Sequence, residues 1–271
     1  MHKQRVLTAL VIIPLVLIGL LWGGTVFFNV LVFVVAFFCL YEYFSMTFQN
    51  SPLLQSLGVL LGLIPLFMAM FKPGDHNIVF ALFLICVSSI IIFLMTYPRH
   101  KNPFSKMAIF LFGCLYIGLF ASLIVLIHPM PYGRLWIIFL FVIVAAADTG
   151  AYYIGSAMGR HKLCPNISRG KTVEGAVGGL IACVLMAVFS WMVFMDFSDL
   201  RALVPLAVLL GVASQIGDLT ESVIKRACGR KDSGRLLPGH GGVFDRVDGL
   251  LMAGPCLFWI LHFLGDYRGI G

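Results

Sequence analysis

Residues 78–97 read IVFALFLICVSSIIIFLMTY, a run of twenty residues without a charged side chain. An α-helix needs about 20 mostly apolar residues to cross the hydrocarbon core of a bilayer. Because that core offers the backbone no hydrogen-bonding partner, only a helix or a closed barrel can satisfy the amide groups of a spanning segment. This stretch therefore predicts a membrane-spanning helix and, with it, the class of the whole chain.

The composition of the whole chain supports the same class. Of its 271 residues, 60% are hydrophobic and only 11% are charged, whereas soluble domains carry about 25% charged residues. Too few polar side chains remain to cover the surface of a water-soluble globule. The composition thus excludes a soluble enzyme, a disordered tail and a fibrous protein.

Further apolar segments on both sides of residues 78–97 predict an all-α, polytopic membrane protein with nine transmembrane helices. The first begins after Lys3 and Arg5 like a signal peptide, but no small-residue cleavage site follows it, which predicts an uncleaved helix. We expect five spans in an N-terminal region, residues 1–134, and four in a C-terminal region, residues 135–271, that carries the candidate catalytic residues. The nine predicted segments are 6–22, 25–45, 53–71, 78–97, 107–127, 135–154, 174–195, 203–222 and 247–265.

The lysines and arginines orient these segments in the membrane. If the nine spans alternate in direction, 15 of the 19 basic residues fall on the side of the N-terminus. Membrane proteins carry an excess of basic residues on their cytoplasmic side. The sequence therefore predicts a cytoplasmic N-terminus and a C-terminus outside.

Carboxylates concentrate at the predicted cytoplasmic ends of the last four spans. Asp218 and Glu221 are three residues apart on one predicted helix and share a face, and Asp245 and Asp248 repeat this spacing on the next. Two such pairs facing each other would offer the oxygen ligands that Mg²⁺ prefers, and carboxylates at a membrane boundary usually mark a site. The alternative is that each carboxylate pairs with a nearby basic residue such as Lys225. The seven acidic residues in this region are Asp148, Glu174, Asp218, Glu221, Asp232, Asp245 and Asp248.

A basic and glycine-rich segment lies between the two acidic pairs. It reads KRACGRKDSGRLLPGHGG over residues 225–242. Basic side chains and exposed glycine amides can surround phosphate oxygens. The alternative, positive-inside charge or contact with anionic lipid, leaves the glycines unexplained. Because the Gly-x-x-x-x-Gly-Lys-Ser/Thr pattern is absent, an ordinary P-loop nucleotide site is excluded.

The segment from Ser222 to Asp248 resembles the signature of the CDP-diacylglycerol synthases, the phosphatidate cytidylyltransferase family. Two further stretches resemble the same family: DTGAYY at residues 148–153 and SRGKTVEG at residues 168–175, where Arg169 replaces a frequent proline. The resemblance covers residues 140–255, whereas the first five spans match only in hydrophobic character. The signature positions filled here are Ser222, Lys225, Arg226, Lys231, Asp232, Gly234, Pro238, Gly239, His240, Gly241, Gly242, Asp245, Arg246 and Asp248.

The resemblance implies a nucleotidyltransferase that converts CTP and phosphatidate into CDP-diacylglycerol and pyrophosphate for phospholipid biosynthesis. It also implies dependence on Mg²⁺, a two-cation site on the aspartates of the signature, and a homodimer. CTP is cytosolic, and phosphatidate exposes its headgroup at the same interface. We therefore expect an active site on the cytoplasmic face of a bacterial inner membrane, with membrane lipids around it and no nucleic acid as a partner.

We assign roles to individual residues as hypotheses. Asp218 and Asp245 are the first choices for cation ligands, and Asp248 and Glu221 come next. His240 either donates a proton to pyrophosphate or forms a hydrogen bond within the glycine-rich turn. The residues expected to support the ligands from behind are Asp148 and Glu174. The residues expected to contact the triphosphate or the lipid phosphate are Lys171, Lys225, Arg226, Lys231, Arg235, Gly239, Gly241, Gly242 and Arg246.

Glu42 is the only acidic residue inside the first five predicted spans. It either lines the substrate cavity or forms a hydrogen bond to a neighbouring helix, and we favour the second interpretation.

Two other functions stay open at this point. A CTP-dependent lipid-alcohol kinase would transfer the γ-phosphate and release CDP. An ion-coupled transporter would place its carboxylates near the middle of the membrane, whereas here they gather at one face. The CDP-alcohol phosphotransferases are excluded because their Asp-Gly-x-x-Ala-Arg pattern is missing.

Overall fold

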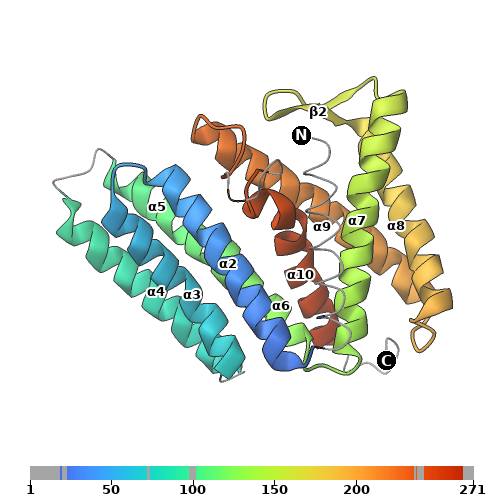
Figure 1. Ribbon diagram of the computed structural model, residues 1–271, viewed down its shortest axis with the longest axis horizontal. Coiled ribbons are helices and arrows are strands. Elements are labelled where there is room, and N and C mark those ends of the chain that lie inside the picture. Colours follow the sequence, from blue (N-terminus) through green and yellow to red (C-terminus); the bar gives the residue numbers. More distant parts are fainter. Residues whose placement is uncertain are drawn as a thin grey trace. The chain divides into compact units, whose positions relative to one another are not determined.

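The computed structural model describes residues 23–71, 74–97, 102–234 and 241–264, together with residues 19 and 236. Within this part the chain is almost entirely helical and contains one two-stranded hairpin (Figure 1). The chain divides into two compact units. Unit 1 comprises Met1–Leu126 and Asp232–Phe244, and unit 2 comprises Ile127–Lys231 and Asp245–Gly271.

Unit 1 consists of helices that follow one another along the chain and pack side by side. They are α2 (Thr25–Thr47), α3 (Pro52–Phe71), α4 (Asp75–Met95), α5 (Pro103–Gly113), the π-helical turn η2 (Cys114–Leu119) and α6 (Phe120–Ile127). Pro103 starts α5 at a position where the missing N–H has no helical partner to lose. From there α5, η2 and α6 continue as a single apolar run, Pro103–Ile127.

Glycines bring the helices of unit 1 into backbone contact. A Cβ atom on Gly118 would lie 1.8 Å from the carbonyl oxygen of Gly62, so η2 and α3 touch directly. Small residues at helix crossings allow this close approach between membrane helices. The rings of Phe44, Phe48 and Phe110 fill the interior of the unit, with centroids 5.2 to 6.1 Å apart.

Unit 2 contains a hairpin and four helices. They are α7 (Gly133–Met158), the antiparallel strands β1 (Lys162–Cys164) and β2 (Ser168–Thr172), α8 (Val173–Val193), α9 (Leu200–Ala227) and, apart from its first residue, α10 (Phe244–Leu264). Helix α8 begins directly after β2 because Thr172 caps it, with its hydroxyl accepting the Gly175 N–H at 3.1 Å. Asp199 caps α9 in the same way and accepts the Arg201 N–H at 2.8 Å.

Helices α7 and α8 cross at small residues. A Cβ atom on Gly175 would lie 2.8 Å from the carbonyl oxygen of Ala151, and one on Gly179 would lie 2.7 Å from that of Ala147. The spacing of the two glycines is the small-xxx-small pattern that favours close packing of membrane helices. This contact fixes the two helices that the hairpin connects, and the hairpin carries Lys171.

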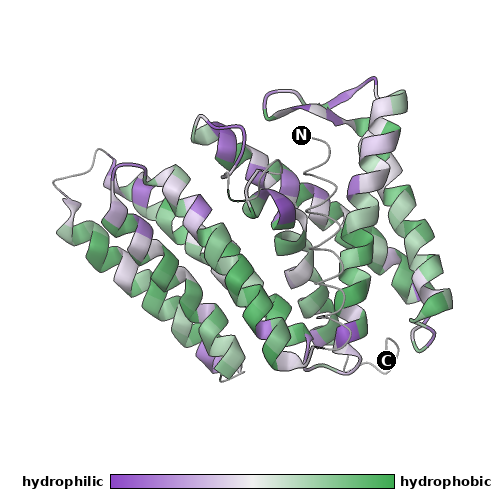
Figure 2. Ribbon diagram, viewed as in Figure 1, coloured by the Kyte–Doolittle hydropathy of each residue, from purple (hydrophilic) through white to green (hydrophobic). Residues whose placement is uncertain are grey.

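Seven helical segments in the described part of the chain are long and apolar enough to cross a membrane. Most of their length is hydrophobic (Figure 2). On α4, Val79, Phe83 and Leu94 are 58 to 67% exposed, which a water-soluble surface rarely tolerates over a large area and a lipid environment favours. The predicted helical membrane protein is confirmed. The seven segments are Thr25–Thr47, Pro52–Phe71, His76–Met95, Pro103–Ile127, Gly133–Met158, Val173–Val193 and Leu200–Ala227.

The other two predicted spans are not among these seven. Residues 6–22 lie outside the described residues except for residue 19. Residues 247–265 are helical as far as α10 is described, but α10 begins with a charged first turn. The count of nine spans and the orientation of the termini therefore stay predictions.

Candidate active site

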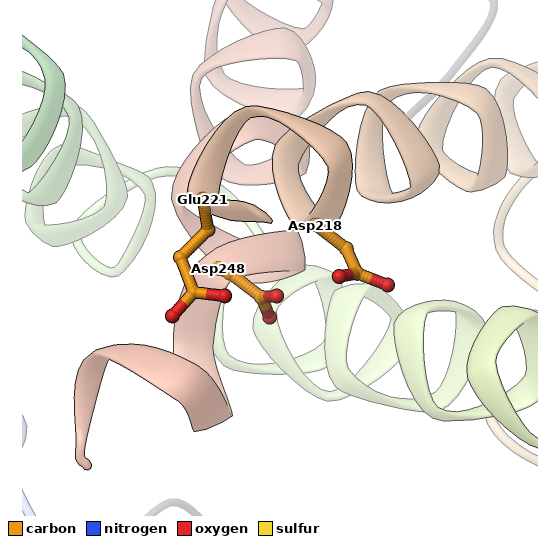
Figure 3. Close-up of side chains that lie close together, drawn as sticks. All are labelled: Asp218, Glu221 and Asp248. Atoms are coloured by element: carbon orange, nitrogen blue, oxygen red, sulfur yellow. The ribbon is translucent and has the colours of Figure 1, made fainter. Parts of the chain in front are cut away.

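Three carboxylates meet where α9 and α10 cross in unit 2. Asp218 and Glu221 come from α9 and Asp248 comes from α10 (Figure 3). Each offers a carboxylate oxygen, and these oxygens all lie within 4.8 Å of one another. The oxygens around a single Mg²⁺ lie about 2.1 Å from the ion, so a small closure would bring all three into one coordination sphere. We call these three residues the carboxylate cluster.

Two glycines make this crossing close enough for the cluster to form. A Cβ atom on Gly217 would lie 2.4 Å from the carbonyl oxygen of Asp248, and one on Gly249 would lie 2.4 Å from the Ser214 hydroxyl. Gly217 directly precedes Asp218, and Gly249 directly follows Asp248. The residues that allow the two backbones to touch thus lie next to the residues that carry the carboxylates.

Glu221 is the most deeply buried member of the cluster, with 1% of its surface exposed. Its Oε2 forms an ion pair with Lys225, with 2.5 Å between the oxygen and the lysine Nζ. Its Oε1 is buried and has no hydrogen-bond partner in the described part of the chain. Because an unpartnered buried carboxylate oxygen is costly, and because hard divalent cations bind carboxylate oxygens, the residues present here fit a metal ion.

Asp245 lies outside the cluster but is linked to it through Lys225. The ammonium group of Lys225 contacts Asp245 Oδ1 at 2.6 Å as well as Glu221, and the lysine side chain is only 13% exposed. A residue expected to contact phosphate is therefore a buried counter-ion between two acids. The sequence leaves open whether each carboxylate pairs with a nearby basic residue instead of binding a metal ion. Glu221 and Asp245 do pair with Lys225.

Lys171 and Asp148 add charge beside the cluster. The ammonium group of Lys171, on strand β2, lies 2.6 Å from Asp218 Oδ2. Asp148, on α7, interacts electrostatically with Asp218, Lys171 and Arg246. Four carboxylates, Asp148 included, thus share one neighbourhood with basic side chains from three separate elements. Such a mixture can bind a cation and a phosphate group together.

The remaining basic residues and Glu174 surround the hairpin or lie exposed. Glu174 accepts the backbone N–H groups of Arg160 and His161 at 3.1 and 3.2 Å, so it fastens the start of α8 to the hairpin. Arg226 donates from Nε to the carbonyl oxygen of Ile167 in the hairpin turn at 3.2 Å. Glu174, expected behind the ligands, therefore supports the hairpin that carries Lys171. The side chains of Lys231 and Arg246 are exposed.

Of the glycine-rich segment, residues 225–242, the structure describes 225–234, 236 and 241–242. Gly241 has a φ of 82°, a conformation that favours glycine, and Gly242 is buried beside Glu42. The predicted site residues Arg235, Gly239 and His240 lie outside the described residues.

Glu42 in unit 1 has a larger structural role than its sequence indicated. It is 2% exposed, and its oxygens accept hydrogen bonds from Ser233 Oγ at 2.8 Å and from the backbone N–H groups of Val243 and Phe244 at 3.0 Å. The expected partner was a neighbouring helix, whereas the structure shows Ser233 inside the glycine-rich segment and the two residues that directly follow it. A lone carboxylate in an otherwise uncharged span was the available signal.

Comparison with known proteins points to one family. The family model for the cytidylyltransferase family matches residues 3–264. A curated protein of Staphylococcus saprophyticus called phosphatidate cytidylyltransferase is 37% identical over 261 residues, which cover 94% of this chain and 97% of that protein. Proteins with the same name are 33% identical in Bacillus subtilis, covering 96% and 97%, and 31% identical in Haemophilus influenzae, covering 97% and 100%.

Proposed function

The chain belongs to the cytidylyltransferase family, and from this premise we propose that it catalyses the reaction of CTP with phosphatidate to give CDP-diacylglycerol and pyrophosphate. Relatives called phosphatidate cytidylyltransferase match it over almost their whole length. The single structural observation that carries the proposal is the carboxylate cluster, with its buried unpartnered oxygen on Glu221 and lysines alongside. The reaction supplies a membrane with an activated lipid for phospholipid biosynthesis.

The chemistry requires positioning and charge neutralisation more than proton transfer. A phosphate oxygen of phosphatidate attacks the α-phosphorus of CTP, a new P–O bond forms, and the bond to the β-phosphate breaks as pyrophosphate leaves. The nucleophile is already anionic, so a strong general base is unnecessary. What the protein must do is hold two polyanions in line and offset their repulsion.

Asp218, Glu221 and Asp248 would hold Mg²⁺. Asp245 would complete the ligand set, since Lys225 contacts both Asp245 and Glu221 and so the two carboxylates lie near each other. A bound divalent cation supplies Lewis-acid stabilisation of charge on the phosphates. A second cation beside the first is part of the same proposal, since Asp148 brings a fifth carboxylate into the neighbourhood.

Basic residues around the cluster would receive the phosphates. Lys171 is a strong candidate because it already lies against Asp218, and Lys231 and Arg246 present exposed side chains. Lys225 and Arg226 would act from the end of α9. His240 would donate a proton to pyrophosphate or support the turn around it. The other proposed phosphate contacts are Arg235, Gly239, Gly241 and Gly242.

We place the site on the cytoplasmic face of a bacterial inner membrane, in a protein of nine spans that assembles as a homodimer. The positive-inside asymmetry of the sequence supports this orientation, and the bacterial relatives support the location. CTP is present only on that side. The N-terminus would then be cytoplasmic and the C-terminus outside.

An assay with labelled substrate tests the proposed function. Purified protein in lipid vesicles would be incubated with phosphatidate, Mg²⁺ and CTP labelled at the α-phosphate. We expect the label to enter the organic phase while pyrophosphate appears in equal amount. CDP release with an unlabelled lipid would instead identify a CTP-dependent kinase. If no CTP is consumed, the result favours a transporter.

A further inference from the structure

Glu42 is a carboxylate that the fold of unit 1 buries and then satisfies completely with its own donors. Burying a carboxylate is costly unless hydrogen bonds replace its water. Here Oε1 accepts the Val243 N–H, and Oε2 accepts both the Ser233 hydroxyl and the Phe244 N–H. Ser233 lies in the middle of the glycine-rich segment, and Val243 and Phe244 directly follow its last residue, Gly242. One side chain therefore joins the middle of that segment to the residues that follow it.

Two glycines of the segment are explained by this contact. A Cβ atom on Gly234 would lie 2.4 Å from Glu42 Oε1, and its three nearest neighbours would all be atoms of Glu42. A Cβ atom on Gly242 would lie 2.2 Å from Glu42 Oε2 and 2.0 Å from the Ser233 hydroxyl. No larger residue fits at either position while the carboxylate stays in place. These glycines thus make room for Glu42.

The contact also fixes the first residue of α10. The first N–H groups of a helix have no partner within it, and a negative group placed there stabilises the helix start. Glu42 accepts the N–H of Phe244, the first residue of α10. The ring of Phe244 is 0% exposed and contacts the rings of Tyr43 and Tyr116, with centroids 6.5 and 6.4 Å apart. Both the backbone and the side chain of this residue are held.

We propose that Glu42 is a positioning residue for the reaction: it ties Ser233, inside the glycine-rich segment, to Val243 and Phe244, which follow the segment, and it sets where α10 begins. The next residue in the chain is Asp245, and the segment carries the residues proposed to contact phosphate, so the inference rests on the proposed function. In this role Glu42 acts through the segment and α10 and is not itself a ligand of substrate or metal. Displacements of about 1 Å in a positioned group can cost about 100-fold in rate.

Glu42→Gln is the sharpest test because it keeps the size of the side chain. An amide has one acceptor oxygen, so its NH₂ group must face a backbone N–H in either orientation. We expect kcat for CDP-diacylglycerol formation to fall about 10- to 100-fold, and amide hydrogen exchange at Val243 and Phe244 to accelerate. The matched control is Tyr43→Phe, which removes a hydrogen bond of the neighbouring residue to the carbonyl oxygen of Ile109 and keeps the ring that contacts Phe244.

A double-mutant cycle separates positioning from general loss of stability. Gly234→Ala should lower kcat in the wild type, because the new methyl group displaces Glu42, but should add little in a Glu42→Ala background, where no carboxylate is left to displace. If the kcat of the Gly234→Ala, Glu42→Ala double variant falls by the product of the two single-variant factors, the proposal is contradicted. So would wild-type kcat in Glu42→Gln, or unchanged exchange at Val243 and Phe244.

The same experiment distinguishes this inference from the proposed function. If the wild-type protein makes no CDP-diacylglycerol, the proposed function fails, while the exchange measurement still decides whether Glu42 holds the segment. If the wild type is active and Glu42→Gln is equally active, only the positioning role fails. Thermal unfolding of each variant in detergent verifies that the compared proteins are folded.

Discussion

Each unit of this protein contains a buried glutamate in a long helix, and the two carboxylates differ in the hydrogen-bond partners that the fold gives them. Glu42 in unit 1 is 2% exposed and accepts hydrogen bonds from one hydroxyl and two backbone amides. Glu221 in unit 2 is 1% exposed, has Lys225 on one oxygen, and has no partner on the other within the described residues. Burial of a carboxylate therefore does not by itself mark a metal site. The deciding property is whether neutral donors of the fold already satisfy it.

The two glutamates therefore have different expected roles, Glu42 in holding the local structure and Glu221 in binding a cation. The contacts of Glu42 are complete without a ligand, so its loss should disturb the shape of the chain around it. The cluster around Glu221 is completed by a cation, so loss of a member should disturb cation binding first. Substitutions that keep side-chain size but change charge can test this difference directly.

The largest effect is expected for Asp248→Asn. The variant keeps the shape of the side chain but removes one negative charge from the cluster, and we expect kcat/KM to fall about 100- to 1,000-fold in the labelled-CTP assay. Asp196→Asn, in the exposed turn between α8 and α9, is the control and should behave as the wild type. Activity of Asp248→Asn within about threefold of wild type, less than 1 kcal/mol, would remove Asp248 from the ligand set.

A matched pair of Glu→Gln variants sharpens the comparison. Glu221→Gln should raise the Mg²⁺ concentration for half-maximal activity about tenfold or more, as expected when a metal site loses a charged oxygen. Glu42→Gln should lower kcat while this concentration changes less than about twofold, because the α9–α10 contact at Gly217 holds Asp248 independently. A Mg²⁺ titration of both variants measures this. If the Mg²⁺ concentration for half-maximal activity rises equally in both variants, Glu42 and Glu221 do not differ in their effect on cation binding.

The sequence could predict the carboxylate cluster because spacing determines which face of a helix a residue occupies. Asp218 and Glu221 share a face by their separation of three, and resemblance to a known signature connects them with Asp248. The backbone contact at Gly217 that brings the two helices together follows no spacing rule. Asp245 illustrates the limit, because the same spacing predicts it beside Asp248, whereas the structure turns it toward Lys225.

The role of Glu42 could not be predicted for a different reason. Its partner Ser233 is 191 residues away in the sequence, and no local period connects positions so far apart. The glycines at 234 and 242 indicated a backbone that something approaches closely. Phosphate was the natural expectation, since it accounts for glycine beside basic residues, but a sequence does not show which group makes the approach.

Lys225→Met tests the pairing that replaces neutral donors in unit 2. The substitution keeps the length of the side chain and leaves Glu221 and Asp245 together without their shared ammonium group. Breaking a buried ion pair leaves uncompensated charge, so the midpoint of thermal unfolding should fall without Mg²⁺ and recover in part when Mg²⁺ is added. The KM for CTP or phosphatidate should rise about tenfold, the effect of losing a charged hydrogen bond.

The control for Lys225→Met is Lys162→Met, at an exposed position of β1. It should change neither the unfolding midpoint nor its response to Mg²⁺. If both KM values of Lys225→Met equal those of the wild type, Lys225 is a counter-ion only and does not contact phosphate. If the midpoint is also unchanged, the buried pairing itself is wrong.

The smallest effect is expected for Glu174→Gln, the third member of the Glu→Gln series. The side chain of Glu174 is 26% exposed, and its bonds to Arg160 and His161 hold the hairpin that presents Lys171 to Asp218. Because water can replace hydrogen bonds at an exposed carboxylate, we expect KM to rise only about two- to threefold with kcat unchanged. Steady-state kinetics of the three variants side by side measures the series. If Glu174→Gln impairs turnover as strongly as Glu42→Gln, then satisfaction in a buried site is not what separates these glutamates, and the hairpin takes part in the chemical step itself.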